Sequence, residues 1–307
     1  MRSVVLHRYA LLVAASTLIL IAAGGLVTST DSGLSVPDWP LSYGQVMPPM
    51  IGGIRFEHTH RLIAGTVGLL TLGLAVLAWR AERRRWARWL ALGAFGTVVL
   101  QAVLGGLTVI YLLPDWISVT HACLAQTFLC LVGVLALVTA REWSEAPRIE
   151  SRYAGSIQRL LITTTAFIYL QLIAGAIVRH SGQGLRYHFV LAFLIALHSL
   201  FIILKCSREQ GTLRALFGHA LLLGGLVTAQ AFLGFASFIL TRRPGRGEVA
   251  PMTEVLSTTV HQTLGALILL VSLLLTLRSY RLLARRRNVP ESHAPEPASG
   301  VFKGLPS

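Results

Sequence analysis

The sequence of 307 residues is short of charged side chains. Asp, Glu, Lys and Arg make up 13% of it, whereas soluble domains carry roughly 25%. The charges stand in short clusters between long apolar runs, which excludes a soluble globular protein and indicates a membrane protein. The net charge of +14 does not point to nucleic acid, because no soluble domain remains to carry a basic face. We therefore expect no nucleic-acid partner.

Cysteine is also scarce, and proline is missing from the apolar runs. Cys123, Cys130 and Cys206 lie inside runs or at a predicted cytoplasmic end, so we expect small apolar fillers and no structural disulfide. The lack of proline inside the runs argues against the broken helices that line the substrate path of many transporters.

What the sequence holds in abundance is apolar runs of roughly 20 residues, the length that a helix needs to cross a bilayer. The runs lie at residues 10–29, 57–79, 89–111, 117–139, 159–178, 187–205, 215–240 and 257–277. We predict an all-α integral membrane protein with eight transmembrane helices, and membrane lipid as a constant partner.

Lys and Arg residues cluster on alternate connections between these runs. Most of them stand near the two chain ends and in residues 80–88, 141–159 and 205–214. By the positive-inside rule these segments face the cytoplasm, so we expect both termini there. We expect the first run to be a retained helix in a bacterial plasma membrane and the tail at 286–307 to be disordered.

A short pattern recurs on the odd-numbered runs, near their predicted outer ends. Gln101, Gln171 and Gln230 are each followed four residues later by glycine, and the first run carries Gly24-Gly25. The even-numbered runs each contribute one candidate histidine, namely His60, His121, His198 and His261. This order predicts two four-helix bundles related as a parallel repeat, at residues 1–145 and 146–285, followed by the tail at 286–307.

Intramembrane histidines are costly and are therefore candidates for function. A single histidine can simply bond to a neighbouring helix, but four at matching places favour axial ligation of haem iron, with two histidines clamping one haem inside each bundle. The alternative of zinc needs clustered ligands, and these four are dispersed. His58, His180, His188 and His219 are weaker candidates near helix ends, and we expect His7 and His293 to be solvated. Candidate partners for haem propionates are Arg61, Arg179, Arg186 and Arg242.

A carboxylate distinguishes the first half from the second. Glu57 stands three residues before His60, whereas Ile195 stands three before His198. A carboxylate near a haem edge can relay protons or stabilise a developing cation. The alternative is an interfacial acid paired with Arg55 or Arg61. We interpret the difference as chemistry in the first half and electron storage in the second.

These residues give the chain its resemblance to haem A synthases. One matching stretch is Gly24-Gly25-Leu26-Val27-Thr28, continued by Ser32-Gly33-Leu34-Ser35 and Pro37-Asp38-Trp39-Pro40, and the other is Glu57-His58-Thr59-His60-Arg61-Leu62. With the order of histidines, the resemblance covers roughly residues 8–280. In one respect the chain departs from it, because many members carry two cysteines in the first external loop and this chain has Ser35, Val36 and Ser42 in the comparable stretch.

The resemblance implies oxidation of a ring methyl of haem O to a formyl group, which gives haem A for cytochrome oxidase. It implies that His60 and His121 flank the substrate haem, that Glu57 is catalytic, and that His198 and His261 hold a haem B cofactor. The partners it suggests are haem O, an electron donor that the sequence does not identify, and haem O synthase. Two alternatives stay open: a di-haem electron-transfer cytochrome of the b type, and a transporter built on a parallel repeat.

Overall fold

The computed structural model describes residues 2–242 and 250–285, and its long helices confirm the eight spans. The helices are α1 (Arg2–Ser29), α2 (Ile54–Ala81), α3 (Arg85–Ile110), α4 (Asp115–Thr139), α6 (Ala154–Ser181), α7 (Leu185–Arg208), α8 (Gln210–Leu240) and α9 (Met252–Leu282). Each begins before its apolar run, because backbone hydrogen bonding continues through the polar residues at the membrane boundary. The chain is a multi-pass membrane protein. The tail at 286–307 and His293 lie outside the described residues.

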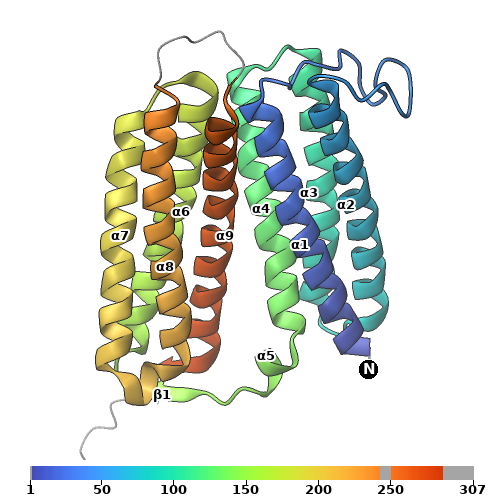
Figure 1. Cartoon of the computed structure of the whole chain (residues 1–307). Coiled ribbons are helices and arrows are strands. Elements are labelled where there is room, and N and C mark those ends of the chain that lie inside the picture. The colour runs from blue at the N-terminus through green and yellow to red at the C-terminus, as the bar shows by residue number, and fades with distance from the viewer. Residues whose placement is uncertain (1, 243–249, 286–307) are drawn as a thin grey trace, which may run out of the picture.

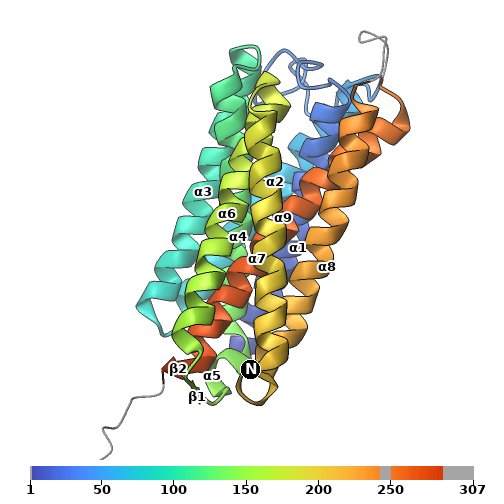
Figure 2. The ribbon, with the colours of Figure 1, turned by 90° about the vertical axis from the view of Figure 1, so that its left-hand side faces the viewer.

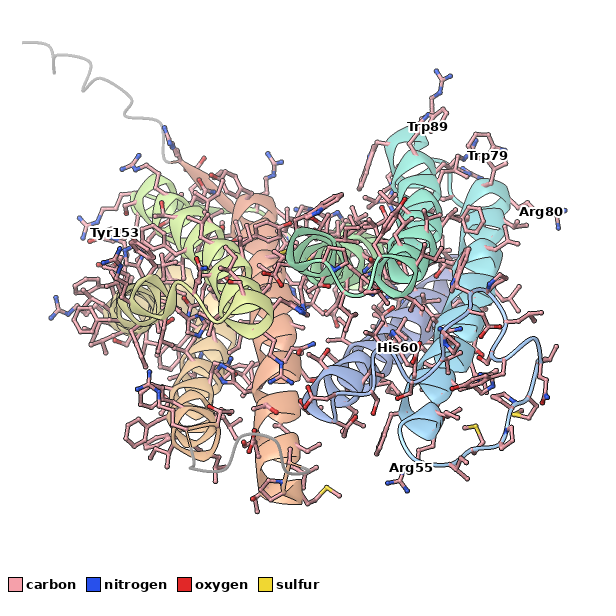
Figure 3. The ribbon with its side chains drawn as sticks, turned by 90° about the horizontal axis from the view of Figure 1, so that it is seen from above. Arg55, His60, Trp79, Arg80, Trp89 and Tyr153 are labelled. Carbon is pink, nitrogen blue, oxygen red and sulfur yellow. The ribbon has the colours of Figure 1, made fainter. Side chains whose placement is uncertain are left out.

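The long helices gather into two groups of four. In the first group α1 contacts α2 and α4, while α3 contacts α2 and α4, and in the second α6 and α8 each contact both α7 and α9. Helices α1, α4, α6 and α9 form the contact between the groups. Figure 1 shows the helices side by side, Figure 2 shows them after a turn of 90° with α9 inclined across the others, and Figure 3 shows the two groups from above.

Each group has its own apolar core. In the first, Leu74, Phe128 and Leu135 are fully buried, and in the second Leu161 and Leu223 are. A smaller cluster joins the groups, and its buried members are Ile21 of α1, Leu129 of α4 and Ala266 of α9. Two cores of this kind fit the predicted halves at 1–145 and 146–285, while a common origin of the halves as a repeat stays a prediction.

Three short elements near the N-terminal end of the molecule were not predicted. They are α5 (Arg141–Glu145), β1 (Ile149–Ser151) and β2 (Leu283–Arg285), and the two strands pair in parallel. The strands join the connection between the groups to the end of α9. Their pairing depends on residues far apart in sequence, so no local pattern announces it.

The segment at 30–53 crosses the opposite end of the first group, which is called the upper end from here on (Figure 1). Asp38 caps a turn of this segment: its carboxylate accepts the backbone N–H groups of Tyr43 at 2.6 Å and Gly44 at 2.8 Å. The N–H of Gly44 and then that of Tyr43 stabilise the ionised form, so the pKa of Asp38 lies below its ordinary value. The Tyr43 hydroxyl donates back to the Ser35 carbonyl at 2.7 Å, which closes the segment on itself.

Candidate functional site

Glu57 lies in the first turn of α2 and is 4% exposed beneath the 30–53 segment. Its Oε2 accepts the backbone N–H of Val36 at 2.8 Å, and its Oε1 accepts Nη2 of Arg61 at 2.6 Å. Of the two sequence-level partners, Arg61 is the one that the structure shows. A buried carboxylate fixed on both oxygens is preorganised, which suits a proton carrier or a stabiliser of positive charge.

Arg61 ties this carboxylate to the overlying segment. Its Nη1 donates to the carbonyl oxygens of Asp38 and Leu41, both at 2.7 Å, and its Nη2 reaches that of Val36 at 3.4 Å. The two terminal nitrogens of the guanidinium therefore donate to the segment and to Glu57. In this arrangement Arg61 ties the segment to Glu57, and its role as a propionate partner stays a prediction.

The neighbouring histidine, His58, points to a different part of the segment. It is 4% exposed, and its Nδ1 contacts Oγ of Ser42 at 2.8 Å, whereas its Nε2 is buried without a hydrogen-bond partner. His58 therefore holds the segment at a second point.

Four histidines lie opposite four glycines of the preceding long helix. A Cβ built on the glycine would stand 3.1 Å from Cε1 of the histidine for Gly24 and His60, and 3.3 Å for Gly105 and His121. The same distance is 3.1 Å for Gly175 and His188, and 2.8 Å for Gly234 and His261. The Cε1 atom of each imidazole thus lies close to backbone that has no side chain, and a Cβ there would require the ring to shift. Figure 3 shows His60 among the helices of the first group.

The histidines of each group fit a haem held from both faces. In the first group His60 faces Gly24 and His121 faces Gly105, and in the second the ring centres of His188 and His261 are 6.3 Å apart. Two imidazoles on opposite faces of one metal, with bonds of about 2 Å and ring radii of about 1 Å, place their centres about 6 Å apart. The Nδ1 atoms of all four are buried and unpaired. Within the described residues no three or more His, Cys, Asp or Glu side chains gather around one point, and axial ligation of haem needs only two.

His60, His121, His188 and His261 share one arrangement against a glycine, whereas His198 lies apart from it. His198 lies ten residues beyond His188 on α7, which is about 15 Å along the axis. Its Nδ1 contacts Oγ1 of Thr164 at 3.2 Å, and its ring packs on Phe167 with centres 5.0 Å apart. His188 takes the place opposite His261 that the sequence analysis gave to His198. The signal that favours His188 is its depth: like the Gln-x-x-x-Gly motifs, it stands near the upper end of its helix.

The glutamines of the repeated motif reach the same histidines. Nε2 of Gln101 donates to the His121 carbonyl at 3.0 Å, and Nε2 of Gln230 donates to that of His261 at 3.0 Å. Nε2 of Gln171 contacts Nε2 of His188 at 3.3 Å. The motif therefore has a physical role, since its glycine receives the imidazole and its glutamine fixes the helix turn that carries it. At the corresponding place before Gly24 stands Leu20, so His60 lacks this partner.

The remaining candidates have other contacts. Nη2 of Arg179 donates to Oγ of Ser29 at 2.8 Å across the two groups, Arg186 donates to the Tyr187 hydroxyl, and Arg242 lies over the Phe238 ring. His219 contacts Arg278, and His180 lies in electrostatic range of His121. His7, expected to be solvated, is half-buried and contacts the Ala136 carbonyl at 2.9 Å. The three cysteines are free thiols on α4 and α7.

Trp39 of the 30–53 segment covers α3 beside the first pair of histidines. A Cβ on Gly106 would stand 2.6 Å from the Trp39 ring, while the adjacent Gly105 faces His121. The two successive glycines thus allow two aromatic rings to approach one helix from different sides. This places the Pro-Asp-Trp-Pro stretch and the histidine pair in one structural unit.

Gly234→Ala is expected to displace the His261 ring and to abolish haem binding between His188 and His261. The added methyl would stand 2.8 Å from a rigid imidazole, and such overlap forces off-rotamer side chains or backbone shifts. The absorbance spectrum of the purified protein and its melting temperature would measure both effects. Gly225→Ala on the same helix is the matched control, because nothing lies within 4 Å of its Cβ. Equal spectra for the two variants would contradict the role given to Gly234.

Comparisons with known proteins give one family and relatives that share one name. A family model described as "Cytochrome oxidase assembly protein", COX15-CtaA, matches residues 7–52 and 54–192, a range that contains His60, His121 and His188. The heme A synthases of Alkalihalophilus pseudofirmus and Shouchella clausii are 29% and 30% identical over 58% and 59% of this chain, and over 60% and 61% of their own lengths. That of Symbiobacterium thermophilum is 33% identical over 56% of this chain and 59% of its own. The chain thus matches about 60% of the length of these relatives.

Proposed function

The chain belongs to the COX15-CtaA family of cytochrome oxidase assembly proteins, and from this premise we propose that it is a haem A synthase. Its substrate would be haem O, whose ring methyl is oxidised to a formyl group to give haem A. The observation that carries the proposal is the set of four histidine–glycine pairs, two in each helix group, with a buried carboxylate beside the first pair. Relatives named heme A synthase agree with it.

The two groups would have different tasks. His60 and His121 would hold the substrate haem in the first group, and His188 and His261 would hold a haem B cofactor in the second, in place of the His198 and His261 pair first expected. Haem iron supplies the redox chemistry at both places. The protein supplies axial ligands, fixed helix turns and an apolar surrounding that keeps water from the reacting carbon.

Glu57 would act on protons and charge at the first pair. It lies one helical turn before His60, so both side chains face the same side of α2. Its oxygens are fixed by Val36 and Arg61, and a carboxylate held in this way can accept the proton lost as the methyl carbon is oxidised, or stabilise positive charge that develops there. Because Arg61 also holds Asp38 and Leu41, the segment above the site would exclude water from it.

Two differences between the groups support a reaction in the first and electron transfer in the second. Leu185 stands where Glu57 would be, three residues before His188, so the second pair has no carboxylate at that place. Leu20 replaces the glutamine that accompanies the other three histidines. His60 would therefore be the ligand without a glutamine side chain beside it, which distinguishes it from the other three.

The basic connections would place the upper end outside the cytoplasm and both termini inside it, in a bacterial plasma membrane. The two groups would form a parallel repeat with boundaries at residues 1–145 and 146–285. An electron donor is a required partner, and haem O synthase would be the source of the substrate.

The test is a haem extraction. The protein would be expressed in cells that also make haem O, and the extracted haems would be separated by chromatography with mass detection. Haem A or its hydroxymethyl precursor, present only when this chain is expressed, is the expected result. Bound haem B with haem O unaltered would overturn the proposal in favour of an electron-transfer cytochrome, and the absence of any haem would favour a transporter.

A further inference from the structure

The tip of the upper segment, residues 41–53, is called the loop tip here and has an unusual composition for an exposed loop. No charged side chain occurs from residue 39 to residue 54. Its exposed apolar side chains are Leu41, Tyr43, Val46, Met47, Met50 and Ile51. Val46 is 76% exposed and Ile51 is 68% exposed, so the described residues leave most of their surface uncovered. A surface of this kind in contact with water would be costly.

The position of the loop tip explains what could cover it. In Figures 1 and 3 the segment projects sideways past α2, beyond the outline of the helices. Helix α2 has 28 residues and is therefore about 42 Å long, which matches the bilayer with its headgroup layers, about 40–45 Å. Its first residues, and the loop tip beside them, then lie at the level of the headgroups.

The flanking residues fit the same level. Arg55, the first charge after the loop tip, is exposed, and its guanidinium lies 4.7 Å from the centre of the Phe56 ring. Figure 3 shows it pointing away from the helices. An arginine beside apolar side chains at this depth can reach lipid phosphates while its stem stays in the apolar layer.

Another connection at the upper end has the opposite character. The turn between α6 and α7 reads Ser181-Gly182-Gln183-Gly184, with Gln183 exposed and no large apolar side chain. Apolar exposure is therefore a property of particular connections and not of the whole upper end. In the first group the turn between α3 and α4 shares it through Leu112, as does Trp116 in the first turn of α4.

From the uncharged loop tip and its sideways position we infer that residues 41–53 are a lipid anchor. They insert into the headgroup and acyl boundary of the leaflet at the upper end, with Val46, Met47 and Ile51 in the apolar layer and Arg55 at the phosphates. Arg61 ties the base of the 30–53 segment to Glu57. The anchor therefore fixes the opposite end of the same segment, the loop tip, to the membrane. The inference does not depend on the haem reaction, because it concerns only where this segment lies.

The experiment places one fluorescent bimane label at a time by cysteine substitution, in purified protein in phosphatidylcholine nanodiscs. The test positions are Met47→Cys and, as a second variant, Ile51→Cys. Gln183→Cys is the water-exposed control and Leu69→Cys, 72% exposed in the middle of α2, is the lipid-exposed control. The unsubstituted protein gives the background, because Cys123 is half-buried while Cys130 and Cys206 are buried. Quenching by phosphatidylcholine with nitroxides at the headgroup or along the acyl chain is compared with quenching by aqueous iodide.

The labels on Met47→Cys and Ile51→Cys are expected to lose most fluorescence to nitroxides near the headgroup, and at least about twice as much as the label on Gln183→Cys, because interfacial segments lie within about 10 Å of that boundary. The Leu69→Cys label should respond most to nitroxides deep in the acyl chain. Quenching of the test labels by iodide as strong as that of the Gln183→Cys label would overturn the inference in favour of a water-exposed loop. Protection from both quenchers would overturn it in favour of burial against a second copy of the chain.

Discussion

Glu57→Gln is expected to stop conversion of haem O while leaving the haem of the second group bound. The amide keeps the size of the side chain and can still accept the Val36 N–H, but it removes the negative charge held by Arg61. General acid–base groups contribute about 10²- to 10⁴-fold to rate, so haem A in extracts should fall by at least about a hundredfold. Chromatography of extracted haems measures the product, and the absorbance spectrum of the purified protein reports the bound haem.

The matched control is Glu82→Gln. Glu82 is also paired with an arginine, since Nη2 of Arg84 lies 2.8 Å from its Oε2, but it stands after α2 at the other end of the molecule. The hydrogen bond from Arg84 lowers the pKa of Glu82, so the substitution also removes an ionised carboxylate. This variant should make haem A at the wild-type level. Unchanged output from Glu57→Gln would remove Glu57 from the mechanism, and loss in both variants would show that any broken ion pair disables the protein.

His188→Leu is expected to abolish the low-spin haem B spectrum, and His261→Leu should do the same. Each removes one imidazole of a pair whose ring centres are 6.3 Å apart, and leucine offers no ligand in its place. Loss of one axial ligand changes the coordination and the spin state of the iron, so absorbance and electron paramagnetic resonance should both register it. Haem A production should fall with it, since the proposed path for electrons is gone.

His198→Leu separates the two assignments of the second ligand. The structure gives this side chain a contact with Thr164 and packing on Phe167, at a depth about 15 Å from His188. The variant should keep its full low-spin spectrum and lose only the stability of one hydrogen bond, about 1 kcal/mol. If His198→Leu loses the spectrum and His188→Leu keeps it, the assignment made from the sequence alone is the correct one.

Much of the site could be predicted from the sequence because its features are local. Glu57, His60 and Arg61 are spaced by one helical turn, so their shared face on α2 follows from helix geometry. The Gln-x-x-x-Gly motifs also mark single helix faces, although their use in receiving histidines could not be inferred from one helix. The histidine that pairs with His261 was harder to predict, because the run at 187–205 contains two histidines and either could be the one expected on that helix. Only the depth of Gly175 in the neighbouring helix distinguishes His188 from His198.

The sequence by itself determined the eight membrane helices, since a bilayer leaves no other way to satisfy the backbone of long apolar runs. It also determined the resemblance that led to the proposed reaction. Only the tertiary structure decided which helices lie together, that Arg61 straps the upper segment to Glu57, and that strands β1 and β2 join distant connections. The physical reason is that apolar faces of membrane helices have no preferred partner in lipid, so packing of small residues and a few polar contacts, spread over distant positions, select the arrangement.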